Sequence, residues 1–398
     1  MEILYVSTLC SKKMIDDLYR KTKINPGFAV QKFNRLVAEG LAKNGQSVMT
    51  LSAVPALKGL TDIFYMSFSK ERSGDVSYSY LPYCSISILR RLLTFFCSFW
   101  QTIRWGFRHR LDKVIVYDVL NISVCIGSLL ASKVLGIRSC GIVTDMPGLM
   151  VPEKKEDSVK KEFMSRFNRW YLQFFDYYVF LTKAMNVEIN RKNRPYIVME
   201  GVVDIEQGLK EYSSPVLRSR SIVYAGGLYE EYGLKVLTEA FLMIKDKSVY
   251  LDLFGSGPLS DWLMRLSESY PQIRYHGVVA NDAIVEFEQK ALLLINPRPT
   301  TEEFTKYSFP SKNMEYMLSG TAMLTTDLPG MPEEYHSYVL KIEDETLDGY
   351  VNALNDSIEL GEIQLCSIGR KAREWILANK NNVIQTDRII KMLSISMA

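Results

Sequence analysis

The feature that most constrains the fold is an alternation of short apolar segments with longer segments of helical spacing, which begins twice along the chain. Segments 3–7 and 114–117 are short and apolar, which is typical of buried strands. Segments 28–44 and 122–135 repeat apolar residues every third or fourth position, which is typical of helices. Strands that alternate with helices indicate parallel βαβ units, so the sequence predicts an α/β fold.

The first series of these units runs to residue 199, and a second series follows a polar segment at 204–220 that contains Ser213-Ser214-Pro215. The first series adds expected strands at 47–51, 139–144, 177–181 and 196–199 and helices at 87–110 and 158–175, with a loop-rich stretch from 52 to 85. The second has expected strands at 221–225, 249–254, 273–275, 292–296 and 322–325 and helices at 233–245, 261–270, 281–289, 311–318 and 363–393.

This pattern predicts two Rossmann-like domains that face a cleft. We assign residues 1–203 to an N-terminal domain, 204–220 to a linker and 221–375 to a C-terminal domain. Residues 376–398 are expected to form a helix that crosses back and packs on the N-terminal domain. Ligands of such sheets lie beyond the carboxyl ends of the strands, which directs attention to the residues that follow each strand.

Composition excludes several classes of protein. The 398 residues suffice for two domains, and 47% hydrophobic with 23% charged residues is a globular balance. Six cysteines without a CxxC pair and three dispersed histidines predict neither a disulfide framework nor a zinc or histidine metal centre. The chain starts MEILYVST, which is typical of a strand, and lacks an apolar run of ~20 residues, so we expect a cytoplasmic protein.

Charge is distributed unevenly between the two halves. Residues 1–200 carry 29 basic and 17 acidic side chains, a net charge of +12, and the remainder carries −9. Such an asymmetry indicates different partners for the two halves, and the first half should prefer an anionic surface.

Residues 89–110 (LRRLLTFFCSFWQTIRWGFRHR) combine basic and aromatic side chains without any acid. This combination is typical of an interfacial helix on anionic lipid, at the inner face of the plasma membrane if the protein is cytoplasmic. The expected membrane contacts are Arg90, Arg91, Trp100, Arg104, Trp105 and Arg108. The alternative is a core helix with arginines at its rims. Nucleic acid is not an expected partner, because no recognition motif accompanies these residues.

The densest group of chemically informative residues lies between 296 and 320. Pro310 can occupy the first turn of a helix, whose free N–H groups form a phosphate site. Lys312 and Glu315 are three residues apart and share one helix face. A cation beside the phosphates and a carboxylate one turn deeper would suit a nucleoside diphosphate. A surface Lys–Glu pair on an ordinary helix is the alternative.

Glycines follow two strands of the second series. Gly226 and Gly227 end one strand, and Gly255, Gly257 and Pro258 follow the next. Glycine allows a ligand to approach the backbone closely and exposes N–H donors, although plain strand-to-helix turns would use the same residues.

Taken together, these segments resemble glycosyltransferases of family four. The supporting stretches occur in the family's order: NPGFAVQKFNRLVAEGL, VTDMPG, SIVYAGGLYEEYGLKVLTEAF, LFGSGPL, IRYHGV and the segment around Pro310. The resemblance implies the GT-B fold and a retaining hexosyltransferase that uses a nucleotide sugar such as a UDP-sugar. It also implies bacterial polysaccharide biosynthesis (capsule, exopolysaccharide or O-antigen), a glycan or lipid-linked acceptor, and no bound metal or other cofactor.

The resemblance also implies roles for individual residues. Glu315 matches the family glutamate that binds the donor ribose, but the partner glutamate eight positions earlier is replaced by Tyr307, which leaves sugar recognition open. Gly27 would approach the transferred sugar or phosphate. The remaining donor-binding residues on this segment would be Ser308, Phe309, Pro310 and Ser311.

The family's phosphate-binding Arg and Lys are missing. Their aligned positions hold Gly227 and Tyr232, neither of which is cationic. Because two phosphates still require positive charge, we expect Arg298 and Lys312 to replace them. The alternative for Arg298 is a loop arginine bound to a nearby carboxylate.

Asp145 ends a strand of the basic half. A carboxylate there could orient or deprotonate an acceptor hydroxyl, or it could cap the turn with its own backbone. No Asp-x-Asp follows a strand, so no divalent-metal clamp is expected.

Two rival functions stay open. One is a nucleotide-sugar 2-epimerase, which shares the GT-B architecture. The other is a non-catalytic subunit that binds a nucleotide sugar, suggested by the missing glutamate and the missing Arg and Lys.

Overall fold

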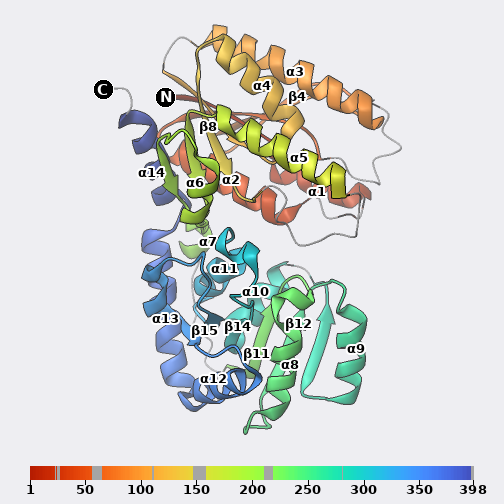
Figure 1. Cartoon of the computed structure of the whole chain (residues 1–398), viewed down its shortest axis with the longest axis vertical. Coiled ribbons are helices and arrows are strands. Elements are labelled where there is room, and N and C mark those ends of the chain that lie inside the picture. The colour runs from red at the N-terminus through yellow and green to blue at the C-terminus, as the bar shows by residue number, and fades with distance from the viewer. Residues whose placement is uncertain are drawn as a thin grey trace. The chain divides into compact units, whose positions relative to one another are not determined.

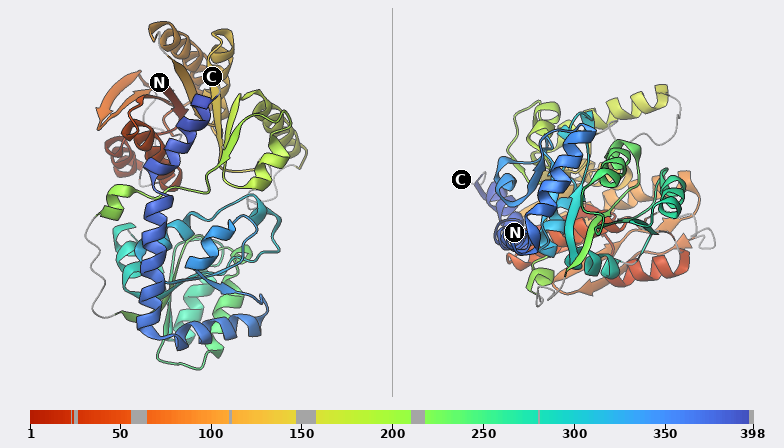
Figure 2. Two further views of the ribbon diagram at one scale, coloured as in Figure 1. Left: turned by 90° about the vertical axis from the view of Figure 1, so that its left-hand side faces the viewer. Right: turned by 90° about the horizontal axis from the view of Figure 1, so that it is seen from below.

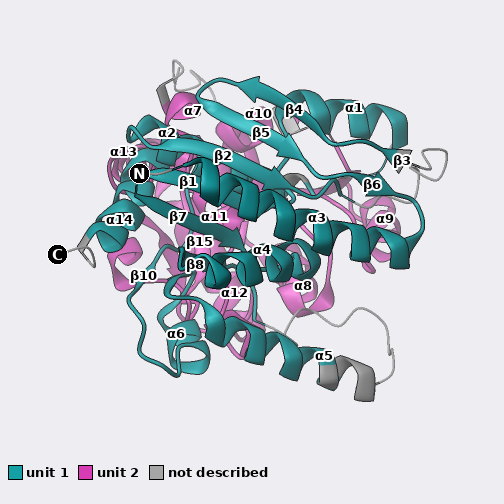
Figure 3. Ribbon diagram, turned by 90° about the horizontal axis from the view of Figure 1, so that it is seen from above, with its two compact units in different colours: residues 1–202, 382–398 teal, residues 203–381 magenta. Residues whose placement is uncertain are grey.

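The computed structural model describes residues 1–22, 24, 27–55, 65–109, 112–146, 158–209, 218–279 and 281–395. The chain forms two compact units, residues 1–202 with 382–398 (unit 1) and residues 203–381 (unit 2), which Figure 3 distinguishes by colour. Each unit is built on its own largely parallel sheet with helices on both faces. The predicted α/β class with two Rossmann-like domains is confirmed.

The main sheet of unit 1 has eight strands in the order β10-β9-β8-β7-β1-β2-β5-β4 (Figure 1). They are β1 (Glu2–Ser7), β2 (Ser47–Ser52), β4 (Ser69–Ser73), β5 (Val76–Tyr80), β7 (Lys113–Asp118), β8 (Arg138–Val143), β9 (Tyr177–Phe180) and β10 (Tyr196–Val198). Neighbouring strands are parallel except β4, which pairs antiparallel with β5. A separate pair joins β3 (Tyr65–Met66) to β6 (Tyr83–Cys84).

The hairpin of β4 and β5 corrects the prediction of a loop-rich stretch between residues 52 and 85. Its edge strand β4 is polar and mostly exposed, so it lacks the apolar pattern by which a strand is recognised. Gly74 turns the hairpin with a φ of 57°, in the left-handed region that glycine adopts without strain.

Helices cover the two faces of this sheet. They are α1 (Lys12–Thr22), α2 (Phe28–Lys43), α3 (Ser87–Arg108), α4 (Ile122–Val134), α5 (Ser158–Tyr171), α6 (Lys183–Ile189) and α14 (Asn382–Ile395). Alternate residues of β1, such as Ile3 and Tyr5, pack with α1, α2 and α14 in one apolar core. On the other face α4 packs directly on β1, β7 and β8, and α3 packs on α4. The helices α1 and α6 were not predicted.

The last helix packs on α2 through a close backbone approach. A Cβ atom on Gly40 would lie 2.3 Å from the carbonyl oxygen of Asn382, so only glycine permits this contact. The side-chain amide of Asn44 donates to the carbonyl of Val383 at 2.8 Å. The helical stretch predicted for 363–393 is therefore two helices, because the chain leaves helical geometry between α13 (Gly361–Asn379) and α14.

Unit 2 contains a six-stranded parallel sheet in the order β13-β12-β11-β14-β15-β16. The strands are β11 (Ser219–Ala225), β12 (Tyr250–Phe254), β13 (Ile273–Gly277), β14 (Ala291–Asn296), β15 (Met323–Thr326) and β16 (Leu340–Ile342). The helices are α7 (Ile205–Leu209), α8 (Leu234–Met243), α9 (Ser260–Ser269), α10 (Asn281–Lys290), α11 (Ser311–Ser319), α12 (Leu347–Glu359) and α13. Both α7 and the start of β11 lie in the segment assigned to the linker.

Two apolar cores enclose this sheet. One joins α8, α9 and α12 to one face, and the other joins α10, α11 and α13 to the opposite face. Figure 2 shows α12 and α13, in blue, beside the sheet of unit 2. Helix α12 and strand β16, which follow the segment around Pro310, were not predicted from the sequence.

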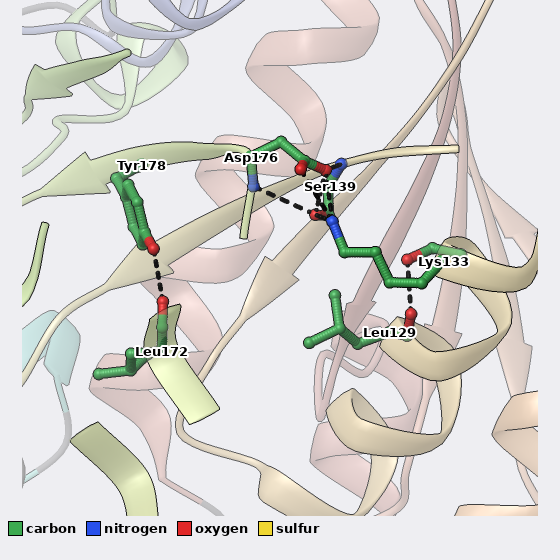
Figure 4. Close-up of polar contacts among 7 residues, drawn as sticks. Leu129, Lys133, Ser139, Leu172, Asp176 and Tyr178 are labelled. Carbon is green, nitrogen blue, oxygen red and sulfur yellow. Dashed lines mark hydrogen bonds and ion pairs between the residues drawn. The ribbon is translucent and has the colours of Figure 1, made fainter. Parts of the chain in front are cut away.

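A charged cluster closes the amino-terminal edge of the unit 1 sheet (Figure 4). Lys133 from α4 donates to both carboxylate oxygens of Asp176 at 2.8 Å, and the Ser139 hydroxyl on β8 donates to the same carboxylate at 2.7 Å. Burial opposes the charge on Asp176, but these donors hold the pKa of the carboxyl below its ordinary value. The cluster lies at the edge opposite Asp145, so it is structural.

Candidate functional site

The carboxyl ends of the strands in unit 2 are joined by backbone hydrogen bonds between their loops. The N–H of Gly226 donates to the carbonyl of Phe254 at 3.0 Å, and the N–H of Gly255 donates to that of Gly277 at 2.8 Å. The N–H of Leu228 donates to the carbonyl of Ser256 at 3.1 Å. The loops after β11, β12 and β13 therefore form one connected edge.

The glycines of these loops are required by contacts within the chain. Gly255 has a φ of 129°, and a Cβ there would lie 1.8 Å from the carbonyl oxygen of Gly226. A Cβ on Gly257 would lie 2.4 Å from the carbonyl oxygen of Leu228. Gly227 faces the ring of Tyr229, and Pro258 follows Gly257 just before α9. Close approach of a ligand to these glycines remains a prediction.

Helix α11 is fixed against the same edge by buried polar contacts. Pro310 precedes its first residue, and among the described residues no side chain caps the first turn. The side-chain amide of Asn296, at the end of β14, donates to Asn313 Oδ1 at 2.7 Å. The N–H of Ala225, at the end of β11, donates to the Tyr316 hydroxyl at 2.8 Å. The sequence analysis gave no role to Asn296, Asn313 or Tyr316, although polar side chains at strand ends are a recognisable signal.

Lys312 and Glu315 form a half-buried ion pair on α11. Lys312 Nζ lies 3.0 Å from Glu315 Oε2, and the two side chains are 32% and 27% exposed. Burial acts to lower the pKa of Lys312, but the carboxylates of Glu315 and Glu288 raise it above its ordinary value. The predicted pairing on one helix face is present, and its partial burial distinguishes it from an ordinary surface pair.

Arg298 is held by aromatic rings. Its guanidinium carbon lies 4.2 Å from the centroid of Tyr232 and 5.4 Å from that of Phe304. Burial lowers the pKa of Arg298, and the groups that oppose this shift are the phenols of Tyr232 and Tyr224, not carboxylates. Its buried Nε makes no hydrogen bond within the described part of the chain. In the part of the chain that the structure describes, no carboxylate is bound to Arg298, contrary to the alternative raised from the sequence.

The loop between β14 and α11 is anchored from two sides. The N–H of Thr300 donates to Glu345 Oε2 at 3.0 Å, and the Tyr350 hydroxyl donates to the carbonyl of Pro297 at 2.8 Å. Tyr307 follows the short helix η4 (Glu303–Lys306) and is partly buried. These contacts fix the backbone that carries Arg298.

The residues just before α11 differ in their surroundings. Phe309 is buried against the ring of Tyr335, with centroids 5.1 Å apart, which gives it a packing role. Ser308 is partly buried, and its hydroxyl oxygen has no partner among the residues that the structure describes. Ser311 is exposed as the first residue of α11.

In unit 1 two carboxyl groups follow neighbouring strands. Asp118 ends β7, and Asp145 lies two residues beyond the end of β8. The Asn34 side-chain amide donates to Asp118 Oδ2 at 2.8 Å, and the Tyr5 hydroxyl donates to Asn34 Oδ1 at 2.6 Å. The sequence did not predict a role for Asp118, Asn34 or Tyr5, because the contacts among these residues depend on how the strands pair.

Burial and then the charge of Asp118 raise the pKa of Asp145 to about 6, although a hydrogen bond from Thr144 opposes the shift. Burial also raises the pKa of Asp118 above its ordinary value. A carboxyl group that titrates near neutral pH can accept and return a proton.

Gly27 precedes α2 with a φ of 84°, in the left-handed region. The start of α2 is fixed by Gln31, whose side chain accepts from the N–H of Cys10 at 2.8 Å and donates to the carbonyl of Thr8 at 2.7 Å. Gly27 thus lies close to the end of β1. Pro147 and Gly148, which belong to the VTDMPG stretch, lie outside the described residues.

The residues predicted to contact membrane fall into three groups. Arg91, Trp100, Arg104 and Arg108 are exposed on α3. Arg90 donates to the carbonyls of Cys84 and Ser85, each at 3.2 Å, and is partly buried. Trp105 is only 3% exposed, so its assignment to membrane contact is wrong: it faces inward, on the side of α3 that packs on the rest of unit 1.

His276 lies at the end of β13, next to Gly277, in a charged cluster. Its Nε2 lies 2.7 Å from Oδ1 of the buried Asp252, which Arg274 also contacts through two nitrogens. Among the described residues no group of three or more His, Cys, Asp or Glu could hold a metal ion.

The chain resembles known proteins in one family match and in overall fold. Residues 219–359, the greater part of unit 2, match the family described as glycosyl transferases group 1. No curated protein matches the sequence. HepE of Anabaena in complex with UDP aligns with a TM-score of 0.62 at 13% identity, over 99% of this chain and 100% of that one.

Two further solved structures have the same fold. Sucrose-phosphate synthase from Thermosynechococcus elongatus aligns with a TM-score of 0.64 at 12% identity, over 100% of both chains. The lipopolysaccharide outer core galactosyltransferase WaaB, in its apo form, gives 0.58 at 13% identity, over 100% of both chains. The fold is GT-B, and the greater part of unit 2 matches a glycosyltransferase family.

Asp145 should make stability depend on pH. Its pKa rises from 3.8 to about 6 in the folded protein, so the folded state binds more protons than the unfolded state in this interval. The stabilisation that Asp145 contributes is therefore fully present below the unfolded-state pKa of 3.8. It is lost as the pH rises through the folded-state pKa of about 6. Asp145→Asn removes this loss, and we expect its melting temperature to exceed that of the wild type increasingly from about pH 4 to about pH 7.

Thermal melts across that range measure the effect, with Asp16→Asn on an exposed position of α1 as the control. If the two variants followed the same pH profile, Asp145 would not have the raised pKa described above.

Proposed function

We propose that this protein is a retaining, metal-independent hexosyltransferase. It moves a sugar from a nucleoside diphosphate donor to a glycan or lipid-linked glycan acceptor in cell-surface polysaccharide assembly, on the cytoplasmic side of the membrane. The observation that carries the proposal is the partly buried Arg298, which aromatic rings hold on the loop that leads from β14 to α11. The family resemblance supports retention of configuration and independence from metal.

A buried cation without a carboxylate partner is costly unless a ligand supplies negative charge. Arg298 lies over the ring of Tyr232, the position where the family carries a cation. The guanidinium of Arg298, on the loop after β14, would therefore take the position of the phosphate-binding cation that the family carries. Arginine suits this role because its planar group binds phosphate through two parallel hydrogen bonds.

Lys312 and α11 would provide the second half of the diphosphate site. The first turn of α11 follows Pro310 and offers backbone N–H groups to an anion. Lys312 adds a charge one residue inside the helix, and Glu315 would accept hydrogen bonds from the ribose hydroxyls. Catalysis would then come from stabilisation of the leaving diphosphate and from positioning of the acceptor.

Asp145 would act on the acceptor side. It follows β8 at the carboxyl edge of the unit 1 sheet, where ligands of such sheets bind. Its raised pKa suits a group that orients or deprotonates a hydroxyl. The polysaccharide role of the acceptor is supported by the resemblance and by the shared fold of WaaB, a lipopolysaccharide outer core galactosyltransferase.

Removing the proposed donor contacts should abolish most transfer. In each of Arg298→Gln, Lys312→Ala and Glu315→Ala, loss of one charged hydrogen bond should cost about 1.5–3 kcal/mol, which is roughly ten- to a hundredfold in donor affinity or turnover. Transfer assays and UDP-induced shifts of the melting temperature measure both quantities. Arg265→Gln, on an exposed position of α9, is the matched control.

The same assay separates the rival functions. With donor alone an epimerase converts the sugar, whereas a transferase needs the acceptor lipid and a binding subunit produces neither product. Near-normal turnover in all three variants would exclude this helix and loop from the active site.

Chelation should leave transfer unchanged. The charges proposed to neutralise the diphosphate are side chains, Arg298 and Lys312, so excess EDTA has no ion to remove from the site. Activity measured before and after dialysis against EDTA checks this expectation. Loss of activity that manganese or magnesium restores would contradict it, and mock dialysis is the control.

Asp145→Asn should separate transfer from donor binding. An amide cannot accept the acceptor's proton, so transfer at saturating donor should fall about a hundredfold or more. UDP affinity should stay at the wild-type value, because Arg298, Lys312 and Glu315 all lie in unit 2. Equal losses of transfer and of UDP binding would instead mark Asp145 as a structural residue.

A further inference from the structure

The helix α3 exposes most of its large apolar side chains and buries its small polar ones, with Trp105 as a buried exception. Its outward positions include Leu89, Leu92, Phe96 and Trp100, spaced three or four residues apart, and Phe107 seven residues further on. Trp100 is 64% and Phe107 73% exposed. The buried positions include Thr94, Ser98, Thr102 and Gly106. This is the reverse of a helix on a soluble core, where the apolar face turns inward.

Close packing against α4 fixes this orientation. The Thr102 hydroxyl donates to Ser128 Oγ of α4 at 2.8 Å. A Cβ on Gly127 of α4 would lie 2.3 Å from both the carbonyl oxygen of Phe95 and Ser98 Oγ. Around Phe95 and Ser98 the backbone of α3 lies too close to α4 for larger side chains to fit between the helices, so the exposed aromatic side chains cannot be buried there. Figure 1 shows α3 in orange beside α4, at the outside of unit 1.

The charge around this face is positive. Arg91, Arg104 and Arg108 are exposed on α3, and the sequence contains no Asp or Glu from residue 76 to residue 111. Large exposed apolar patches mark interaction sites. An apolar stripe bordered by arginines fits the boundary between lipid headgroups and acyl chains. Within the described residues, no helix is long and apolar enough to cross a membrane.

We propose that the exposed face of α3 docks on an anionic lipid bilayer. Phe96, Trp100 and Phe107 enter the acyl boundary, and Arg91, Arg104 and Arg108 contact the anionic headgroups. A second copy of this chain is the competing occupant, but two copies of α3 would bring together two positive surfaces without an acid to pair them. The inference concerns attachment and goes beyond the proposed transfer reaction.

Sedimentation with vesicles tests the proposal. We expect the full chain to bind vesicles of equimolar phosphatidylglycerol and phosphatidylcholine, to bind phosphatidylcholine vesicles much less, and to be released as salt rises from about 0.1 M to about 1 M. The variant Arg91→Gln, Arg104→Gln, Arg108→Gln should bind on the order of a hundredfold more weakly, because each arginine near an anionic surface contributes a factor of about five. Arg90 is left intact because it holds the backbone at Cys84 and Ser85.

A second variant tests the apolar contribution. Phe96→Ser, Trp100→Ser, Phe107→Ser should lose vesicle binding at every salt concentration while its melting temperature stays close to that of the wild type, because the side chains are exposed. Met243→Ser, Ile363→Ser removes two exposed apolar side chains of unit 2 and should bind vesicles as the wild type does.

Three outcomes would overturn the proposal. They are absence of binding to the anionic vesicles at low salt, equal binding by the serine variant of α3, and a wild-type dimer in solution that this variant converts to a monomer. The last would assign the face to a second copy. None depends on turnover, so attachment and the transfer reaction can fail separately.

Discussion

Parallel pairing of the strands is the constraint on which both candidate sites depend. Because the strands of each sheet run in the same direction, all their carboxyl ends meet at one edge, and the residues that follow them are brought together. In unit 2 this edge collects Gly226, Gly255 and Asn296, and α11 is fixed to it through Tyr316. In unit 1 it brings Asp118 and Asp145 to neighbouring positions.

The electrostatics at these edges explain why the residues are candidates for function. Arg298 is supported by rings, Lys312 by the carboxylates of Glu315 and Glu288, and Asp145 lies beside another carboxyl group. Each of these arrangements has a higher free energy than a buried charge with a full set of hydrogen-bonded partners. An arginine stacked on aromatic rings and a carboxyl group with a raised pKa are more useful to a ligand than to the folded chain.

Exposure of the apolar surface of α3 to water is also unfavourable in free energy. The helix accepts exposure of Phe96, Trp100 and Phe107 because small residues at its inner face give tight packing with α4. The donor site proposed for unit 2 would bind its ligand through a partly buried charge. The attachment surface proposed for unit 1 would bind lipid through an exposed apolar stripe. Only the attachment surface follows the charge asymmetry between the two halves of the chain, because it lies in the half with the net charge of +12.

The sequence by itself determined the alternation of strands and helices, the glycines after β11 and β12, and the pairing of Lys312 with Glu315, because these depend on local spacing. Tertiary structure decided which residues from distant segments of the chain come into contact. The ring of Tyr232 beneath Arg298, and Asp118 beside Asp145, arise from contacts between segments far apart in the chain. Trp105 and Trp100 look alike in sequence, yet one is buried and the other exposed, because the helix phase was set by Thr94, Ser98 and Thr102 packing inward.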